Sequence, residues 1–327
     1  MSQLDKSAVS LEEMAQALKA ADNFVICGHV SPDGDCLGSE LGLAWALRAL
    51  GKKVVCLRAK DEPVEFGLRF LPGVEDVIPA CEYEGSVESF ITVDVPTAKR
   101  MGVDAAELHV QATRTFTIDH HLSQEPLSHL NYVDASAPAA ALIIWKLIPY
   151  LGIKPDVQMA TCCYVGLITD CGRFTYQNTT ADALSCAAEM LAVGVDPAKV
   201  AAEVYENRSR ASLALERRVI EHCEYLNGGQ VLISYLKRSD FVETNSTKVD
   251  AESMIDLLRS VRGVQIACML REQDGQVRGS LRSKDSTDVA KIAAQFEGGG
   301  HKAAAGFTYK GSLADARRDL AEILGNL

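Results

Sequence analysis

One histidine and two aspartates stand within seven positions in the run Gly-His29-Val-Ser-Pro-Asp33-Gly-Asp35. Pro, Gly and Asp are ordinary turn residues, and an aspartate here can cap a helix that follows. An imidazole has no such use in a turn. The spacing His-x3-Asp-x-Asp brings one nitrogen and two carboxylates near a common point, a ligand set that suits a borderline divalent metal. The run is a candidate metal site if distant parts of the chain supply further ligands.

Further residues of these types stand directly after apolar runs, and they are Asp94, Asp119, His120, His121 and Asp170. Taken singly, each has a simpler explanation as a turn aspartate, a surface histidine or a helix-terminal aspartate. An aspartate at the carboxyl end of a helix, as expected for Asp170, meets the unfavourable end of the helix dipole, which favours a cation as its partner. The run at 29–35, Asp94 and the triplet at 119–121 each stand at the end of a predicted strand, and three such groups are unlikely to arise by chance.

Apolar patterning predicts the elements that position these residues. We expect helices at 12–18, 36–50, 138–151, 155–168 and 180–193, and strands at 24–27, 53–57, 90–93 and 114–118. Strands that alternate with helices predict an α/β fold whose parallel sheet is covered on both faces. In such sheets ligands bind beyond the carboxyl ends of the strands, which is where the candidate residues stand.

The candidate ligands are too many for one metal ion and suit two ions that share a carboxylate: His29, Asp33, Asp35, Asp94, His120 and Asp170. Two metals roughly 3.5–4 Å apart can hold the attacking and leaving oxygens of an in-line phosphoryl displacement. Mixed imidazole and carboxylate ligands favour Mn²⁺, Fe²⁺ or Co²⁺ over Mg²⁺. We expect two divalent ions, with Mn²⁺ first and Mg²⁺, Co²⁺ or Fe²⁺ as alternatives.

Composition limits the classes of partner. The chain has 327 residues and a net charge of −11, which predicts repulsion of long duplex nucleic acid. We expect no membrane span, because apolar runs stay below roughly 18 residues. The N-terminus lacks the pattern of a signal peptide. Ten cysteines without a C-x-x-C pair favour buried, reduced thiols, so the predicted location is the cytoplasm.

The pattern predicts two domains, 1–194 and 211–327, joined by a connector at 195–210. The second is predicted as a smaller α/β domain. Its expected strands lie at 231–236, 264–271 and 277–282, and its expected helices lie near 251–261, 288–296 and 313–325.

Candidate substrate-binding residues of the second domain are Arg282, Ser283, Gly298, Gly299, Gly300 and His301. Glycines let a backbone approach a phosphate closely and offer N–H donors to it, although a lone glycine run can also be an ordinary loop. An arginine adds a bidentate contact, and a histidine can stack on a base or hydrogen bond. Arg278 and Lys302 are interpreted as solvated charges.

These motifs resemble the DHH family of phosphoesterases, named for the triplet seen here as Asp119-His120-His121. His-x3-Asp-x-Asp, Asp94, the triplet and Gly-Leu-Ile-Thr-Asp170 occur in the order typical of that family. The stretch Gly298-Gly-Gly-His301 resembles the motif of the DHH-associated C-terminal domain. Length and layout most resemble the NrnA-type subgroup, which degrades very short RNA oligonucleotides and removes the 3′-phosphate of 3′-phosphoadenosine-5′-phosphate (pAp).

The resemblance also implies roles for single residues. One metal would be held by His29, Asp33 and Asp94, and the other by Asp35, Asp94, His120 and Asp170, so that Asp94 bridges. His121 would face the scissile phosphate, and Asp119 would orient its neighbours. The active site would lie in a cleft between the two domains.

Several functions stay open at this stage. Within the family, the substrates could be cyclic or linear dinucleotide second messengers such as cyclic di-AMP and pApA. A manganese-dependent pyrophosphatase has a similar metal motif, and a non-catalytic, metal-dependent nucleotide-binding regulator is a third alternative. The expected partners are short single-stranded RNA or small nucleotides. The subunit number is not decided by the sequence, and a homodimer is compatible with it.

Overall fold

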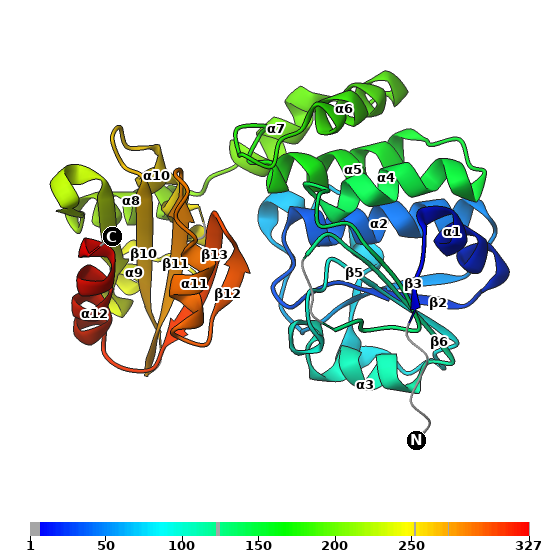
Figure 1. Cartoon of the computed structure of the whole chain (residues 1–327), viewed down its shortest axis with the longest axis horizontal. Helices are drawn as coiled ribbons and strands as arrows, with labels where there is room; N and C mark the ends of the chain where they lie inside the picture. Colours follow the sequence, from blue (N-terminus) through cyan, green and yellow to red (C-terminus); the bar gives the residue numbers. More distant parts are fainter. Residues whose placement is uncertain (1–6, 122–124, 252, 274, 327) are drawn as a thin grey trace. The chain divides into compact units, whose positions relative to one another are not determined.

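The chain divides into two units, Met1–Asn207 and Arg208–Leu327, here called unit 1 and unit 2. Figure 1 shows the computed structural model, which describes residues 7–121, 125–251, 253–273 and 275–326. Each unit has its own sheet and its own apolar cores.

Unit 1 has a parallel sheet. In the part of the chain that the structure describes, its strands follow the order β1-β7-β6-β5-β2-β3-β4, and every neighbouring pair is parallel. The strands are β1 (Ser7–Ala8), β2 (Phe24–Cys27), β3 (Val54–Arg58), β4 (Ile78–Pro79), β5 (Ser89–Val93), β6 (Arg114–Asp119) and β7 (Leu130–Val133). All residues of β2 and β5 are buried, as expected for central strands covered on both faces.

The helices of unit 1 are α1 (Leu11–Ala20), α2 (Gly34–Ala49), α3 (Val103–Gln111), α4 (Ala140–Leu151), α5 (Val157–Asp170), α6 (Ala181–Val193) and α7 (Pro197–Tyr205). Helices α1, α2, α4 and α5 lie over one face of the sheet, and α3 lies over the other (Figure 1). This arrangement confirms the predicted α/β fold with a parallel sheet.

Helix α2 is buried on all sides because it lies between the sheet and helices α4 and α5. Its start is capped by the carboxylate of Asp33, which accepts from the backbone N–H groups of Asp35 and Cys36. A side chain at Gly38 would place its Cβ 2.5 Å from the Cys162 carbonyl oxygen of α5. The glycine therefore lets α2 and α5 pack closely, and Gly34 in the first turn of α2 likewise lies against Thr169 in the last turn of α5.

Unit 2 has a mixed sheet in the order β12-β13-β11-β10-β9-β8. Its strands are β8 (Glu224–Leu226), β9 (Val231–Leu236), β10 (Ile266–Gln273), β11 (Gln276–Ser283), β12 (Gly299–His301) and β13 (Ala304–Tyr309). Helices α11 (Val289–Ala294) and α12 (Leu313–Gly325) pack on one face. Helices α8 (Arg210–Glu221) and α10 (Met254–Ser260) pack on the other face, over β9 and β10, with α9 (Arg238–Thr244) beside them. This is the smaller α/β domain that was predicted.

The residues predicted as a connector, 195–210, contain a helix. Helix α7 occupies most of them, and Val195 and Val200 are buried in the apolar core of unit 1. Asp196 caps the start of this helix, because its side chain accepts from the backbone N–H groups of Ala198 and Lys199.

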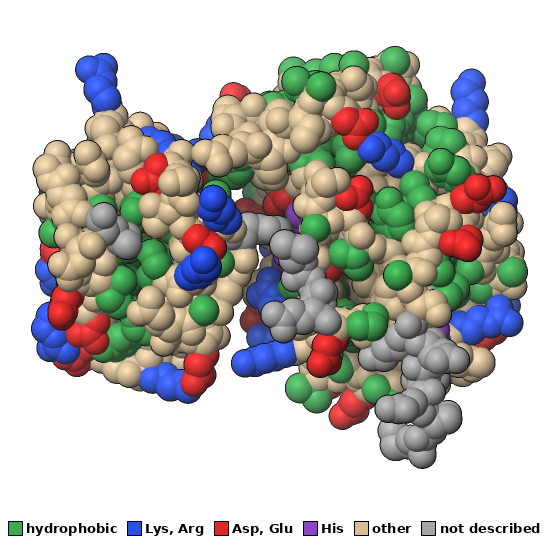
Figure 2. All heavy atoms as spheres, in the orientation of Figure 1, with side chains coloured by type: hydrophobic (Ala, Val, Ile, Leu, Met, Phe, Trp, Pro, Cys, Tyr) green, Lys and Arg blue, Asp and Glu red, His purple; other side chains and the backbone are tan. Residues whose placement is uncertain are grey.

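Charged residues of both signs are interspersed over the face of each unit seen in Figure 2. All ten cysteines are free, and eight of them are buried, as predicted. None of the helices in the described residues combines the length and apolar character needed to cross a membrane.

Candidate metal centre

Three neighbouring strands of unit 1 bring the candidate residues to one edge of the sheet. Strand β5 lies between β2 and β6, with Cys27 paired to Thr92 and Val93 paired to Ile118. The residues that follow these strands therefore lie side by side, as the sequence predicted.

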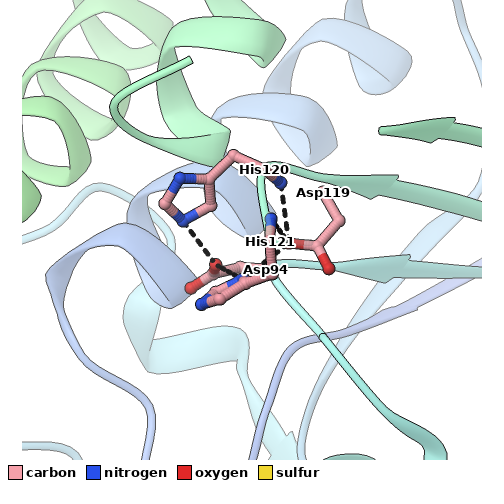
Figure 3. A group of neighbouring side chains, drawn as sticks. All are labelled: Asp94, Asp119, His120 and His121. Atoms are coloured by element: carbon pink, nitrogen blue, oxygen red, sulfur yellow. Dashed lines mark hydrogen bonds and ion pairs between the residues drawn. The ribbon is translucent and has the colours of Figure 1, made fainter. Parts of the chain in front are cut away.

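Asp94 lies at the centre of this edge. Its carboxylate is buried, with Oδ2 3.3 Å from His29 Nε2 and Oδ1 3.3 Å from His120 Nε2. Its backbone has a φ of 57°, a left-handed conformation that is uncommon for a non-glycine residue and is often found at functional sites. Figure 3 shows the contact between Asp94 and His120. One carboxylate thus stands between two imidazoles.

The other ring nitrogens of these histidines face backbone carbonyls. His29 Nδ1 lies 2.9 Å from the Val30 oxygen, and His120 Nδ1 lies 3.2 Å from the Ala137 oxygen. An N–H at Nδ1 that donates to a carbonyl leaves Nε2 with its lone pair directed at the carboxylates, which is the usual arrangement of a metal-binding histidine. Among the described residues, Asp94 Oδ1 has no hydrogen-bond partner. A divalent cation would satisfy this orphaned oxygen, so the donor set fits a metal.

The candidate ligands form two groups that share Asp94. In one group, Asp33 Oδ2 lies 3.6 Å from His29 Nε2. In the other, His120 Nε2 lies 3.6 Å from Asp35 Oδ2 and 3.9 Å from Asp170 Oδ2. The side chain of Asp33 is 61% exposed, whereas the side chains of His29, Asp35, Asp94 and His120 are buried. The centre is therefore open mainly at Asp33 and to a smaller extent at Asp170, whose side chain is 27% exposed.

Asp35 is held in place by the start of helix α4. Its Oδ2 accepts from the Ala140 N–H at 2.7 Å, and its Oδ1 accepts from the Ala141 N–H at 2.8 Å. Backbone N–H groups at a helix N-terminus favour negative charge, which partly offsets the cost of burying this carboxylate.

The buried carboxylates and imidazoles at the centre shift one another's pKa values. Burial and the nearby Asp94 raise the pKa of Asp35 well above its usual value. Burial raises the pKa of Asp170 to about 7, against the opposing charge of His120 and with smaller contributions from the charges of Asp33 and Asp94. Burial lowers the pKa of His120, but the contact with Asp94 and the charges of Asp35 and Asp170 overcome this and raise it to about 11. Without a metal the centre holds protons that a divalent cation would replace.

Asp119 organises the two histidines that follow it. Its Oδ1 accepts from the backbone N–H of His120 at 2.7 Å and from that of His121 at 3.1 Å. The same oxygen lies 2.8 Å from His121 Nδ1. The His121 side chain is 20% exposed, and a proton on Nδ1 places the lone pair of the ring on Nε2.

Two residues near the centre were missed by sequence reasoning. The Cys36 thiol lies close to His29 and Asp94, but burial, followed by nearby acidic groups, raises its pKa well above normal. In the metal-free protein it is a neutral thiol, and coordination of a metal would require its deprotonation. Arg100 NH2 lies 3.3 Å from His29 Nδ1, and the Arg100 carbonyl accepts from the Val30 N–H. In the sequence, only the position of Arg100 six residues after Asp94 indicates that it lies near the centre.

In unit 2, strand register places part of the predicted set on one sheet face. Residue 301 pairs with Ala304, which pairs with Arg282, and Gly299 pairs with Gly306. Paired residues point to the same face, so Arg282 and Gly299 share it. The side chain of His301 lies outside what the structure describes.

Ser283 is not part of this group. It follows Arg282 on the same strand and therefore points to the opposite face, where it is buried. Its hydroxyl contacts Asp285, with Oγ 2.9 Å from Asp285 Oδ1. The observed hydroxyl contact is structural, which differs from the substrate contact expected from the sequence.

Two of the three glycines have a packing reason. A Cβ at Gly298 would lie 2.3 Å from the Gly306 oxygen, and one at Gly300, where φ is 142°, would lie 2.4 Å from the Ala304 oxygen. At Gly299 the surrounding space is open, with nothing within 4 Å. Of the three, Gly299 alone is left for a ligand-related explanation.

Arg278 is not the solvated charge that was expected from the sequence. It is partly buried, and its guanidinium donates from NH1 to Thr308 Oγ1 at 3.1 Å. Lys302 is exposed, as predicted.

Comparison with known proteins gives consistent matches over both units. Residues 23–167 match the model of the DHH family, N-terminal domain, and residues 228–326 match that of the DHHA1 domain. A bifunctional oligoribonuclease and PAP phosphatase, NrnA, of Thermus thermophilus is 34% identical over 305 residues, covering 91% of this chain and 88% of that protein. A probable protein of the same kind from Streptococcus mutans is 30% identical over 312 residues, covering 95% and 96%.

A solved structure is similar over the same extent. The crystal structure of an exopolyphosphatase-related protein from Bacteroides fragilis has a TM-score of 0.88 and 26% identity to this chain. The match covers 97% of this chain and 95% of that one.

Proposed function

We propose a function from the premise that this chain belongs to the DHH family of phosphoesterases, with an N-terminal DHH domain and a DHHA1 domain. The protein hydrolyses short RNA oligonucleotides to mononucleotides and removes the 3′-phosphate of pAp. The names of its NrnA relatives, which the chain matches over nearly their whole length, support these substrates.

The observation that carries the proposed chemistry is the position of Asp94. Its two oxygens each lie 3.3 Å from the Nε2 atom of a different histidine, and Oδ1 lacks a hydrogen-bond partner among the described residues. A carboxylate so placed is suited to bridge two metal ions. We infer Mn²⁺ as the ion, because imidazole and carboxylate ligands together favour it over Mg²⁺.

The residues divide into two ligand sets. His29, Asp33 and Asp94 would hold one ion, and Asp35, Asp94, His120 and Asp170 would hold the other. When bound, the two ions supply Lewis acidity and charge neutralisation for an in-line displacement at phosphorus.

His121 is proposed as the general acid or base. Its Nδ1 contacts Asp119, which would fix the ring orientation and the tautomer and leave Nε2 to exchange a proton with the substrate. Asp119 acts as a positioning residue, because its Oδ1 also accepts from the backbone of both histidines.

Unit 2 is proposed to bind the part of the substrate that does not react. Arg282 offers a charge-assisted, bidentate contact to a second phosphate, and Gly299 lets that phosphate approach the backbone of the same sheet face. His301 is proposed to stack on a base or to hydrogen bond.

The relatives do not favour the alternative functions. Hydrolysis of cyclic dinucleotides or pyrophosphate would be a different use of the same metal centre, and a non-catalytic regulator would have no need of the full ligand set. Free, mostly buried cysteines support a reducing compartment, and we infer the cytoplasm.

A substrate panel tests the proposal. The purified protein is incubated with Mn²⁺ and, separately, with pAp, pApA, five-nucleotide RNA, a cyclic dinucleotide and pyrophosphate. We expect hydrolysis of pAp and of the RNA, and none by an Asp94→Ala preparation, which controls for contaminating nucleases. Hydrolysis of only pyrophosphate or only the cyclic dinucleotide would overturn the proposed substrates.

A further inference from the structure

The unit 2 sheet carries three arginines on the face opposite α11 and α12. Arg278 and Arg282 alternate with buried residues along β11, and Arg271 of β10 is paired with Arg278. Their partners on β13 are Thr308 for Arg278 and Ala304 for Arg282. Side chains at these positions are partly exposed, whereas the alternate residues Val277, Leu281 and Phe307 are buried against the helices. We call Arg271, Arg278 and Arg282 the arginine row.

Positive charge is concentrated here although the chain as a whole is acidic. Arg271 and Arg278 stand directly opposite each other, an arrangement that is unfavourable for like charges on neighbouring strands. Lys284 continues the same side of β11, and its pKa is lowered by burial and by the charge of Arg259 on α10. With the net charge of −11, a local cluster of this kind is typical of an anion site.

The arginines surround a strip of the sheet with small side chains. Ser280, Gly306 and Gly299 lie in one register row across β11, β13 and β12. The Arg271 guanidinium donates to Ser280 Oγ at 3.3 Å. Arg278 NH2 would lie 3.3 Å from a Cβ at Gly306, so this guanidinium extends over the glycine. Both guanidinium groups therefore reach the strip, where an anion can approach the backbone.

The two ends of the row are separate. Arg278 and Arg282 are four residues apart on one strand, which corresponds to roughly 13 Å between their Cα atoms. A phosphate bound at Arg282 therefore lies at one end of the row, and Arg271 and Arg278 lie at the other end.

We propose that Arg271 and Arg278 form a second phosphate subsite, distinct from that at Arg282, which binds an additional backbone phosphate of an RNA oligonucleotide. This inference rests on the proposed function. It adds a reason why the protein would act on oligonucleotides as well as on pAp. In pAp one phosphate reacts and the other would bind at Arg282, so no third phosphate reaches the subsite.

The subsite predicts a length-dependent effect of Arg278→Ala. Loss of one charge-assisted contact should lower kcat/KM for a five-nucleotide RNA roughly ten-fold, through KM, and leave pAp hydrolysis unchanged. The salt dependence should change too. The slope of log(kcat/KM) against log[salt] should become shallower by about 0.7 for the RNA, since one phosphate contact to a single strand is lost.

Thr308→Val is the matched control. It removes the hydroxyl that Arg278 contacts but keeps both arginine charges and the β-branched shape. We expect this variant to hydrolyse the RNA like wild type, and Arg271→Ala to resemble Arg278→Ala. All are measured as the full chain with Mn²⁺, alongside thermal melting.

Three results would overturn the subsite: no effect of Arg278→Ala on the RNA, equal losses on RNA and pAp, or the same loss in Thr308→Val. The last would show that the arginine acts only through the sheet. Failure of the proposed function is recognised separately, because wild-type protein would then hydrolyse neither pAp nor the RNA.

Discussion

Replacing His121 and His120 separately distinguishes a catalytic histidine from a metal ligand at adjacent positions. His121 Nδ1 lies 2.8 Å from Asp119 Oδ1 and 3.4 Å from Asp94 Oδ1. The shorter contact shows that this nitrogen is engaged by Asp119. His120 Nε2, in contrast, lies within 3.3–3.9 Å of oxygens from Asp94, Asp35 and Asp170. The second geometry is the one expected of the proposed shared metal ligand.

His121→Ala should therefore lower kcat without removing metal. General acid or base catalysis by a positioned side chain contributes roughly 10²–10⁴-fold, which corresponds to about 3–5 kcal/mol in the barrier. The ring is partly exposed, so its removal should cost little stability. His120→Ala should lose about one metal ion per chain, because that ligand faces the group formed with Asp35 and Asp170.

The assay combines kcat for pAp with the Mn²⁺ content of each dialysed variant, determined by elemental analysis. Asp119→Asn is a useful intermediate, since the amide oxygen can still accept from the backbone of the histidines while the negative charge is lost. We expect it to lower kcat less than His121→Ala does. Loss of one metal ion from His121→Ala, with full metal content in His120→Ala, would refute the assignment of the two histidines.

Three further outcomes follow from the geometry. Arg282→Ala should raise KM for pApA roughly ten- to a hundred-fold and leave a small chromogenic phosphodiester unaffected; equal losses in kcat/KM for both would place Arg282 in the catalytic centre or the fold. Gly300→Ala should lower the melting temperature, because φ at Gly300 is 142° and the added Cβ would lie 2.4 Å from a carbonyl oxygen. Gly299→Ala should affect only KM, so equal melting temperatures of the two variants would contradict this explanation. In the metal-free protein the pKa values of Asp170, about 7, and His120, about 11, are both raised, so the folded state loses stability as pH rises through them. The melting temperature should therefore fall from pH 6 to pH 9, and Mn²⁺ should suppress this fall. A melting temperature that rises over this range would contradict the sign.

The core of unit 1 was predictable because its strands are short, continuous apolar runs. Strands β2, β5 and β6 were predicted within one residue of their observed ends, and the parallel order places their carboxyl ends together. Their polar continuations, His29, Asp94 and Asp119, could then be recognised as neighbours. This part of the site needed only the pattern of the sequence and the rule for parallel sheets.

Elements with weak patterns were missed. Strand β13 has alanines and Gly306 where apolar, β-branched residues are usual, so it resembles a loop in sequence. Helix α3 has exposed Val103 and Val110, which obscure its apolar face. Helix α7 follows Gly194 closely and begins with Pro197, and its residues were assigned to a connector. Its packing against unit 1 depends on contacts that sequence alone does not show.

Which of the candidate substrate-binding residues of unit 2 share a sheet face could be decided only from the sheet register. Adjacent residues on a strand point to opposite faces, so Ser283 could have been separated from Arg282 once the strand was placed. The same alternation puts Arg278 on the face of Arg282, which was overlooked. The packing reasons for Gly298 and Gly300 depend on the β12–β13 hairpin, a contact absent from the predicted elements.

Metal stoichiometry in Asp94→Ala tests the two-metal centre most directly. Wild-type protein and the variant are loaded with Mn²⁺, freed of excess metal and measured by elemental analysis, with circular dichroism to confirm that both are folded. The bridging role of Asp94 predicts two ions per wild-type chain, and at most one per variant chain together with loss of hydrolysis of every substrate. Two ions and substantial hydrolysis in the folded variant, or a single ion in active wild-type protein, would contradict it.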